Sequence, residues 1–212
     1  AFIVAKTQEE GADLGVAYDG DADRCFFVDD SGAFVAGDFV TALLAEVMLG
    51  KSPGGTVLYD VRASWAVPRT IEASGGTALV NRVGHAFIKH RMREEHAIFA
   101  GEVSAHYYFR DFTQADTGVV PFLLMLELIS TRGVKLSEIL RSFRERYFIT
   151  GEINTPVADV SLKLREIEAS VRFDRRWRGC RAGLGHVDQA FTGRLAPGEQ
   201  AQKIQRFRAA PE

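Results

Sequence analysis

The feature that most constrains the fold of this chain is an acidic hexapeptide, DGDADR, at residues 19–24. Apolar runs flank it at residues 14–18 and 25–28, so the pattern predicts a tight loop between two buried strands. Three carboxylates at alternate positions, with a glycine between the first two, suit a hard cation such as Mg2+ because every second side chain can point inward. The arginine that follows would lie beside the cation. A cation next to a guanidinium group indicates an anionic ligand, and phosphate is the usual one.

Three other interpretations of the acidic loop compete with a metal site. Clusters of aspartate and glycine also form ordinary surface turns. An EF-hand loop requires glycine at its sixth position and glutamate at its twelfth, where this chain has Arg24 and Asp30. A phosphatase with an aspartate nucleophile usually has threonine or valine two places after its second acidic residue, where this chain has Asp23. The EF-hand and the phosphatase are therefore the weaker alternatives.

Beyond the acidic loop, short apolar runs alternate with longer amphipathic segments, which predicts an α/β fold. Strand-helix-strand units of this size imply parallel strands joined by right-handed crossovers, so we expect a mixed, largely parallel sheet with flanking helices. The expected strands are residues 56–60, 77–80 and 97–100, and the expected helices are residues 37–49, 65–74 and 85–95. Asp38 is the expected N-cap of the first helix, and its expected buried stripe is Leu43, Leu44 and Val47.

Polar segments follow the expected strands directly, at residues 60–62, 81–85 and 101–106. The carboxyl ends of parallel strands meet at one edge of a sheet, and ligands of α/β proteins bind at that edge. We therefore expect the three polar loops to converge on one ligand site.

Further elements are expected on both sides of this core. Residues 29–32 (DDSG) predict a hairpin turn after which residues 33–35 pair back. The later elements are expected to be helices over residues 116–132 and 136–146, a strand over 147–154 and a helix over 160–171. Asp116 or Thr117 would cap the first of these helices, whose expected core side chains are Phe122, Leu123, Leu126 and Ile129.

A second polar motif, GEVSAH, occupies residues 101–106. Together the two motifs resemble the metal-binding and sugar-binding loops of the alpha-D-phosphohexomutases, the family of bacterial phosphomannomutase/phosphoglucomutase. They occur in the family's order and at its approximate separation, and the similarity runs from residue 1 to about residue 160. The Glu-x-Ser-x-His form of the second motif resembles the phosphomannomutase/phosphoglucomutase branch, and does not exclude activity on both sugars.

The resemblance implies three parts of unequal completeness. Residues 1–34 would be the C-terminal part of the family's second domain and would carry the metal-binding loop. Residues 35–147 would be its third domain with the sugar-binding loop, and residues 148–212 a partial or diverged fourth domain.

By the same resemblance, Asp19, Asp21 and Asp23 would bind Mg2+, and a phosphoserine outside this chain would be its fourth protein ligand. Arg24 would help to hold the phosphate group that is transferred. His106 corresponds to a substrate-binding residue that also assists proton transfer, so Arg24 and His106 are the expected catalytic residues.

Four more residues match substrate-binding positions of the family. Glu102 and Ser104 correspond to the residues that grip sugar hydroxyls, and His85 and Arg62 to positions that line the cleft. On sequence alone, a histidine such as His85 after a glycine is more often just the first residue of a helix.

The remaining charged residues carry weaker expectations. Arg82 falls in a cleft loop, whereas Lys89 and Arg110 are expected to be surface charges. The histidines that match no family position are expected to be solvated or structural, and they are His90, His96 and His186.

The family's reaction interconverts hexose 1-phosphate and hexose 6-phosphate, with mannose or glucose as the sugar, through a phosphoserine and a bisphosphorylated intermediate. Since no phosphoserine segment occurs in these residues, we expect the chain to be inactive as a mutase on its own. The alternative is a non-catalytic, Mg2+-dependent module that binds sugar phosphates. Turnover after addition of a separate N-terminal part would favour the enzyme, and binding without turnover would favour the module.

Composition excludes several other classes of partner. The formal net charge of -2 and the isoelectric point near 6.3 give no reason to expect nucleic acid or an anionic membrane. The apolar run at residues 119–126 is too short to span a bilayer, and the N-terminus has no signal-peptide layout. The two cysteines, Cys25 and Cys180, suggest a reducing compartment, so a cytoplasmic location is expected. The oligomeric state is left undetermined.

The two ends of the chain are unusual. It begins with Ala1 in an apolar run, which suggests a piece of a longer protein. From about residue 172 the sequence is arginine-rich and aperiodic, and the family's phosphate-binding string Arg-x-Ser-Asn-Thr-x-Pro does not occur. We hypothesise that this tail is either diverged or read in a shifted frame, and an intact continuation in another frame of the source DNA would identify the shift.

Overall fold

The chain divides into two compact units in a computed structural model that describes residues 2–148, 153–154, 156–173 and 203–204. The smaller unit pairs strand β9 (Ile153–Asn154) with β10 (Lys203–Ile204) in antiparallel fashion. Its helix α7 (Val160–Phe173) confirms the helix expected over residues 160–171. Residues 149–152 of the expected strand, and the tail from residue 174 to 202 with its His186 and Cys180, lie outside the described residues.

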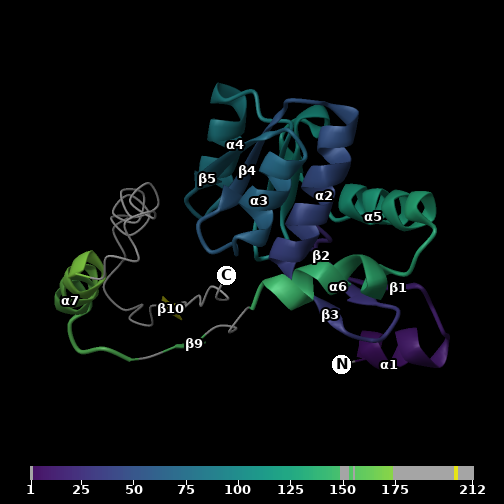
Figure 1. Cartoon of the computed structure of the whole chain (residues 1–212), viewed down its shortest axis with the longest axis horizontal. Helices are drawn as coiled ribbons and strands as arrows, with labels where there is room; N and C mark the ends of the chain where they lie inside the picture. Colours follow the sequence, from purple (N-terminus) through teal and green to yellow (C-terminus); the bar gives the residue numbers. More distant parts are fainter. Residues whose placement is uncertain (1, 149–152, 155, 174–202, 205–212) are drawn as a thin grey trace. The chain divides into compact units, whose positions relative to one another are not determined.

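A five-stranded mixed sheet forms the centre of the larger unit, with the strand order β5-β4-β6-β7-β8. Figure 1 labels its strands β4 and β5 beside helices α3 and α4. Strand β4 runs parallel to β5 and β6, whereas β7 and β8 are antiparallel additions at one edge. This arrangement confirms the predicted fold class. The strands are β4 (Thr56–Asp60), β5 (Thr77–Asn81), β6 (Phe99–Gly101), β7 (Tyr107–Phe109) and β8 (Ala115–Asp116).

Side chains alternate across this sheet and build a separate hydrophobic cluster on each face. Val57 and Phe99 belong to the larger cluster, which includes helices α2 and α3. Leu58 and Ala100, their sequence neighbours, belong to the smaller cluster under helix α4. The covering helices are α2 (Gly37–Lys51), α3 (Ala66–Ala73) and α4 (His85–Glu94).

A three-stranded antiparallel sheet carries the acidic loop. It has the order β1-β2-β3, and α1 packs against its first two strands. The predicted turn at residues 29–32 is confirmed, because Gly32 has a φ of 83° and Phe34 pairs back with Val28. The elements are α1 (Phe2–Glu9), β1 (Leu14–Tyr18), β2 (Cys25–Asp29) and β3 (Phe34–Val35).

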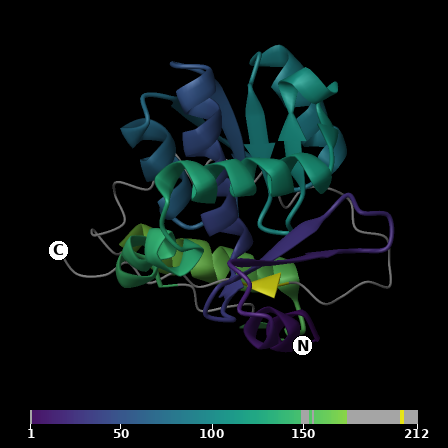
Figure 2. The ribbon, with the colours of Figure 1, turned by 90° about the vertical axis from the view of Figure 1, so that its right-hand side faces the viewer.

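Two helices join this sheet to the rest of the unit. Helix α5 (Val119–Arg132) follows a 3-10 turn (Arg110–Phe112) and β8, and contacts both α2 and β2; it crosses the face turned to the viewer in Figure 2. Helix α6 (Leu136–Arg146) begins at the β2-β3 turn, where Ser137 donates from N and Oγ to the Asp30 carboxylate at 2.8 and 2.9 Å.

The predicted N-cap at Asp38 is wrong. Helix α2 begins at Gly37, and its N-cap is Ala36, which lies two residues before Asp38 and makes no side-chain capping bond. Asp38 lies inside the first turn, 3% exposed, and its Oδ2 accepts a hydrogen bond from the Ser64 N at 3.3 Å. The carboxylate therefore ties α2 to the segment before α3. Leu43 and Leu44 are fully buried as predicted, and Val47 packs partly buried against the core.

The buried face predicted for α5 is also partly wrong. Asp116 lies in β8, and the helix begins at Val119. The helix buries Pro121, Met125 and Leu128, whereas Leu123 and Leu126 are 56% and 38% exposed. The sequence of this helix is apolar almost all round, so periodicity alone does not select the face that packs. Among the described residues, no helix combines the length and apolarity needed to cross a bilayer.

Candidate functional site: two loops joined through the main chain

The acidic loop and the second polar motif meet in space. An isolated antiparallel bridge joins Arg24 to His106, and the Cys25 N donates to the Ala105 O at 3.2 Å. On the other side of the loop, the Gly118 N donates to the Ala22 O at 3.0 Å. The relative position of the two loops is therefore set by backbone hydrogen bonds.

Two glycines allow this close approach. A Cβ on Gly118 would lie 2.8 Å from the Ala22 O and 2.7 Å from the Tyr18 ring. A Cβ on Gly37, at the start of α2, would lie 3.0 Å from the Val103 carbonyl carbon. Side-chain carbons do not tolerate such distances, so any other residue at these positions would push the loops apart.

The acidic loop brings its three carboxylates together. Asp19, Asp21 and Asp23 each offer an oxygen, and these oxygens lie within 4.8 Å of one another. Arg24 compensates the first of them, since its Nε donates to Asp19 Oδ2 and its backbone N donates to Asp19 Oδ1 at 3.2 Å. Desolvation raises the pKa of Asp19, but the hydrogen bonds and the charge of Arg24 outweigh it, so the net shift is downward. Asp19 is therefore held as a carboxylate.

Asp23 is in the opposite situation. Its Oδ1 is buried and accepts no hydrogen bond from any described residue. Desolvation raises the pKa of Asp23, and neighbouring carboxylates add to the shift, against an opposing contribution from His106. His106 Nε2 lies 3.7 Å from this Oδ1, and Asp116 completes a second possible ligand group with these two residues. A buried carboxylate oxygen in this state calls for a cation.

The second motif places a buried carboxylate at its centre. Glu102 is 3% exposed, and its two oxygens accept one hydrogen bond each from separate elements. The Gly84 N donates to Oε1 at 3.2 Å, and the Tyr108 hydroxyl donates to Oε2 at 2.7 Å. His106 Nδ1 lies 3.6 Å from the same Oε2 and 3.0 Å from the Ser104 Oγ. Glu102, Ser104 and His106 therefore form one contact network.

The carboxyl end of β4 holds this motif through a buried carboxylate. Asp60 is fully buried, and its Oδ2 accepts a hydrogen bond from the Val103 N at 2.8 Å. The same carboxylate binds Arg62 through the backbone N at 2.7 Å and the side-chain Nη2 at 2.7 Å. Contacts between Asp60 and Val103, and between Gly84 and Glu102, show that the three polar loops converge as predicted.

Lys89 is not the surface charge that its sequence position suggested. Its Nζ binds Asp116 Oδ1 at 2.7 Å, and its side chain is 28% exposed. Desolvation raises the pKa of Asp116, but the hydrogen bond from Lys89 outweighs it and lowers the pKa overall. Arg110 does behave as expected, because it is exposed and pairs with its neighbour Asp111, whose side chain is 75% exposed.

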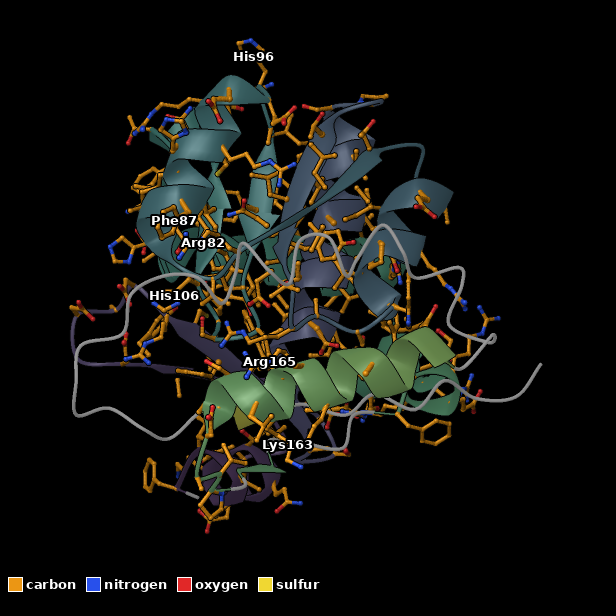
Figure 3. All side chains as sticks on the ribbon, turned by 90° about the vertical axis from the view of Figure 1, so that its left-hand side faces the viewer. Arg82, Phe87, His96, His106, Lys163 and Arg165 are labelled. Carbon is orange, nitrogen blue, oxygen red and sulfur yellow. The ribbon has the colours of Figure 1, made fainter. Side chains whose placement is uncertain are left out.

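The loop after β5 holds the other predicted residues. His85 is exposed at the start of α4. The Arg82 guanidinium lies 3.6 Å from the centre of the Phe87 ring, and Figure 3 shows these two side chains together. His96 lies at the far end of the unit from His106 in the same view, which agrees with its expected lack of a site role. His90 pairs with Glu94 on the exposed side of α4 at 3.1 Å.

Sequence reasoning missed Tyr108 and Asp116 as members of the site, and it placed Asp60 in a site loop without giving it a role. Asp60 was visible as an acidic residue at the end of a buried strand, next to the predicted Arg62. Tyr108 and Asp116 gave no such signal, because strands β7 and β8 are only three and two residues long. Their places follow from antiparallel pairing at the sheet edge.

These features define an α/β protein in which an acidic loop faces a cluster of polar loops at the carboxyl ends of parallel strands. Comparison with known proteins identifies one family within this broad class. The family model for phosphoglucomutase/phosphomannomutase, alpha/beta/alpha domain III, matches residues 36–147. The chain belongs to this family, which confirms the family resemblance seen in the sequence.

Individual relatives agree with this assignment. A phosphomannomutase from Salmonella montevideo is 45% identical over 161 residues, which cover 76% of this chain and 35% of the relative. Phosphohexose mutases from Xanthomonas campestris pv. campestris are 43% identical over 162 residues, with 76% and 36% covered. The solved structure of a phosphoglucomutase/phosphomannomutase family protein from Burkholderia thailandensis has a TM-score of 0.69 at 29% identity, and covers 84% of this chain and 37% of that one. The chain thus spans about a third of the length of the curated relatives it matches.

Proposed function

We propose that this chain is the metal-binding and sugar-binding part of a hexose-phosphate mutase, an intramolecular phosphotransferase acting on mannose or glucose phosphates. One observation carries the proposal: the backbone bridge between Arg24 and His106 brings the acidic loop to the sugar-binding loop. A phosphate group and a sugar hydroxyl must be held at one point for phosphoryl transfer, and the two loops meet at such a point. Hexose phosphate is the proposed ligand, and no feature of the site suggests nucleic acid or a membrane.

The acidic loop fits Mg2+. The oxygens of Asp19, Asp21 and Asp23 are close enough to share one ion, and the buried Asp23 Oδ1 accepts no hydrogen bond from any described residue. Oxygen-rich, carboxylate sites of this kind select hard cations. When bound, Mg2+ would neutralise charge on the phosphate group that is transferred.

The chain's own residues would orient the reactants and accept a proton from the sugar hydroxyl. Arg24 offers its guanidinium to the transferring phosphate from the edge of the acidic loop. His106, between Asp23 and Glu102, would accept the proton of the attacking sugar hydroxyl, since both of its ring nitrogens lie within 4 Å of acidic groups that can hold the imidazolium. We propose that the phosphoserine donor belongs to the length of the relatives that this chain does not span.

Sugar recognition falls to the second motif and its neighbours. The Glu102 carboxylate and the Ser104 hydroxyl would accept hydrogen bonds from sugar hydroxyls. Arg62 and His85 border the same loops and would contact the ligand from the carboxyl ends of β4 and β5.

The proposed parts of the chain follow from these roles. Residues 1–34 supply the acidic loop, residues 35–147 supply the sugar-binding domain, and residues 148–212 correspond to a partial or diverged fourth domain. We propose that the chain binds hexose phosphate but does not turn it over alone, and that it works in the cytoplasm.

The test is calorimetric titration with mannose 1-phosphate and glucose 1-phosphate, with and without Mg2+. We expect saturable binding that Mg2+ strengthens and that Glu102→Ala abolishes. The matched control is Glu94→Ala, which removes a carboxylate whose side chain is 62% exposed on α4. Turnover by the chain alone would contradict its proposed inactivity. Turnover after addition of a phosphoserine-bearing N-terminal part would establish the enzyme, and binding without turnover in that mixture would identify a binding module.

A further inference from the structure

Tyr107 and Tyr108 are neighbours on β7 that have the same burial and opposite surroundings. Both are fully buried. Tyr107 belongs to the cluster on the α2 side of the sheet, and its hydroxyl has no hydrogen-bond partner among the described residues. Tyr108 belongs to the cluster on the α4 side, and its hydroxyl donates to Glu102 Oε2 at 2.7 Å. Only the second phenol can influence the sugar-binding loop directly.

We propose that Tyr108 is a positioning residue that fixes the Glu102 carboxylate in the orientation needed to select ligand hydroxyls. The proposal rests on the function proposed above for Glu102. It adds a residue from β7, outside both sequence motifs.

The geometry supports a fixed donor at this position. Strand pairing places Tyr108 opposite Ala100 on one side and Asp116 on the other, so its backbone is held by two ladders. Its ring packs with Ile88 and Met92 of α4. The Lys89 ammonium lies 5.7 Å from the ring centre while it binds Asp116, so a cation also contacts the ring.

The phenol must stay protonated to donate. Burial raises the pKa of Tyr108, and the hydrogen bond to Glu102 raises it further. The hydroxyl is therefore a permanent donor at physiological pH, and it is a neutral one. A neutral donor orients the carboxylate without cancelling its charge, which leaves the charge available to the ligand.

The arrangement also limits what Glu102 can accept. A carboxylate has about four acceptor positions. The Gly84 N occupies one on Oε1 and the Tyr108 hydroxyl occupies one on Oε2, so each oxygen keeps one acceptor position for a further donor. Without the phenol, the carboxylate could rotate about its last torsion angle, which has broad energy wells. Selection among hydroxyls would then weaken.

The test compares Tyr108→Phe with the matched control Tyr107→Phe in the full 212-residue chain. Each variant removes one buried hydroxyl from the same strand. Because the freed Glu102 carboxylate would have to be ordered again on binding, we expect Tyr108→Phe to bind glucose 1-phosphate about tenfold or more weakly, and Tyr107→Phe to bind it like the parent chain. In a Glu102→Ala background, Tyr108→Phe should not lower the free energy of unfolding any further, because the hydroxyl has already lost its acceptor.

A readout that needs no ligand separates this inference from the proposed function. In NMR spectra of the ligand-free chain, Tyr108→Phe should shift the Gly84 amide proton, because that proton bonds the same carboxylate. Glu102→Ala should in turn shift the ring 13Cζ signal of Tyr108 and leave that of Tyr107 unchanged. An unmoved Gly84 amide together with an unmoved Tyr108 13Cζ signal would overturn the inference, as would equal losses of affinity in the two phenylalanine variants. If the parent chain binds no hexose phosphate while these signals do shift, the proposed function fails and the Tyr108 contact stands.

Discussion

The two loops of the site lie against each other but are held in different ways. The loop proposed to bind the sugar (residues 101–106, the sugar-binding loop below) is anchored to buried groups on the sheet: Asp60 binds the Val103 N, and Tyr108 and the Gly84 N bind Glu102. In the acidic loop, only Asp19 has a strong internal partner, which is Arg24 of the same loop. Hydrogen bonds hold the backbone of this loop in place, whereas the carboxylates of Asp21 and Asp23 have no comparable partner among the described residues.

The difference means that one loop is positioned before a ligand binds, whereas the other needs a cation to balance its charge. A carboxylate with neutral donors, such as Glu102, keeps its place without a ligand. A cluster of three aspartates with one arginine keeps an excess of negative charge, so its side chains reach their final order only when a cation arrives. We expect the sugar-binding loop to be ordered in the free chain and the acidic loop to become ordered on binding Mg2+.

The largest effect is expected from Asp60→Asn, which would break the anchoring of the sugar-binding loop. The substitution removes the negative charge that pairs with Arg62 and weakens the bond from the Val103 N, so it should lower the free energy of unfolding by about 3 kcal/mol. Urea unfolding at neutral pH measures this loss. The matched control is Asp111→Asn, where an aspartate beside an arginine is exposed and its removal should cost almost nothing. Equal losses in the two variants would show that Asp60 is no anchor.

Asp23→Asn tests the other loop. Since loss of a mere outer-shell partner weakens metal binding by about 10- to 100-fold, loss of this direct carboxylate should weaken Mg2+ binding by at least as much. Calorimetry with MgCl2 measures the affinity, and Asp13→Asn removes an exposed carboxylate before β1 as a control. In the parent chain, Mg2+ should slow hydrogen exchange at the Arg24 amide and leave the Val103 amide unchanged. Equal slowing of exchange at both amides would contradict the expectation that Mg2+ orders the acidic loop alone.

A third prediction concerns the support under the acidic hairpin. Arg144 Nη1 of α6 lies 2.7 Å from Asp29 Oδ2 at the end of β2, and Asp29 is fully buried. Burial raises the pKa of Asp29, but hydrogen bonds from Ser31 and Arg144 outweigh it and lower the pKa overall. Arg144→Met should lower the free energy of unfolding by about 1–2 kcal/mol near neutral pH, less than for a fully buried pair because Arg144 is 34% exposed.

The sign of its pH dependence follows from the lowered pKa. The stabilisation is present above the unfolded aspartate pKa of about 3.9, and it is lost as the pH falls through the lower pKa of the folded state. The difference in stability between the parent chain and Arg144→Met should therefore be largest at pH 7, and it should disappear as the pH falls below about 4. Thermal unfolding across this range measures the difference. The control Arg141→Met removes a 68% exposed arginine of α6 and should show no such trend.

The smallest effect is expected from Lys89→Met. It removes a partly buried ion pair with Asp116, whose side chain is 14% exposed, and should lower the free energy of unfolding by about 1 kcal/mol. The same change in the exposed pair of Lys51 with Glu127 should give a smaller loss. A larger loss of unfolding free energy in Lys51→Met than in Lys89→Met would mean that the ion pair of Lys89 with Asp116 adds little to the stability of this sheet edge.

Much of this arrangement was predictable because the motifs lie at the ends of strands with clear apolar patterns. The acidic loop follows β1 and the sugar-binding loop follows β6, and both strands were expected. The face of α5 was not predictable, since Leu123 and Met125 are equally apolar and only tertiary packing distinguishes them.

Long-range polar partners were the other gap. Asp38 has the sequence signature of an N-cap, yet tertiary contact with Ser64 decides its role. Tyr108 looks like a core residue, and nothing local reveals that its hydroxyl reaches Glu102. Such pairs depend on which strands become neighbours, and a strand of three residues gives too weak a pattern to show this.

The backbone bridge between Arg24 and His106 has a consequence for how this site can vary between related proteins. Main-chain hydrogen bonds do not depend on which side chains the bonded residues carry, so either residue can be exchanged without changing the spacing of the loops. The spacing itself depends on Gly37 and Gly118, where a single added methyl group would meet the opposite backbone. Substitutions at the polar positions of the two loops can therefore change the chemistry of the site. The spacing between the loops stays the same as long as both glycines are kept.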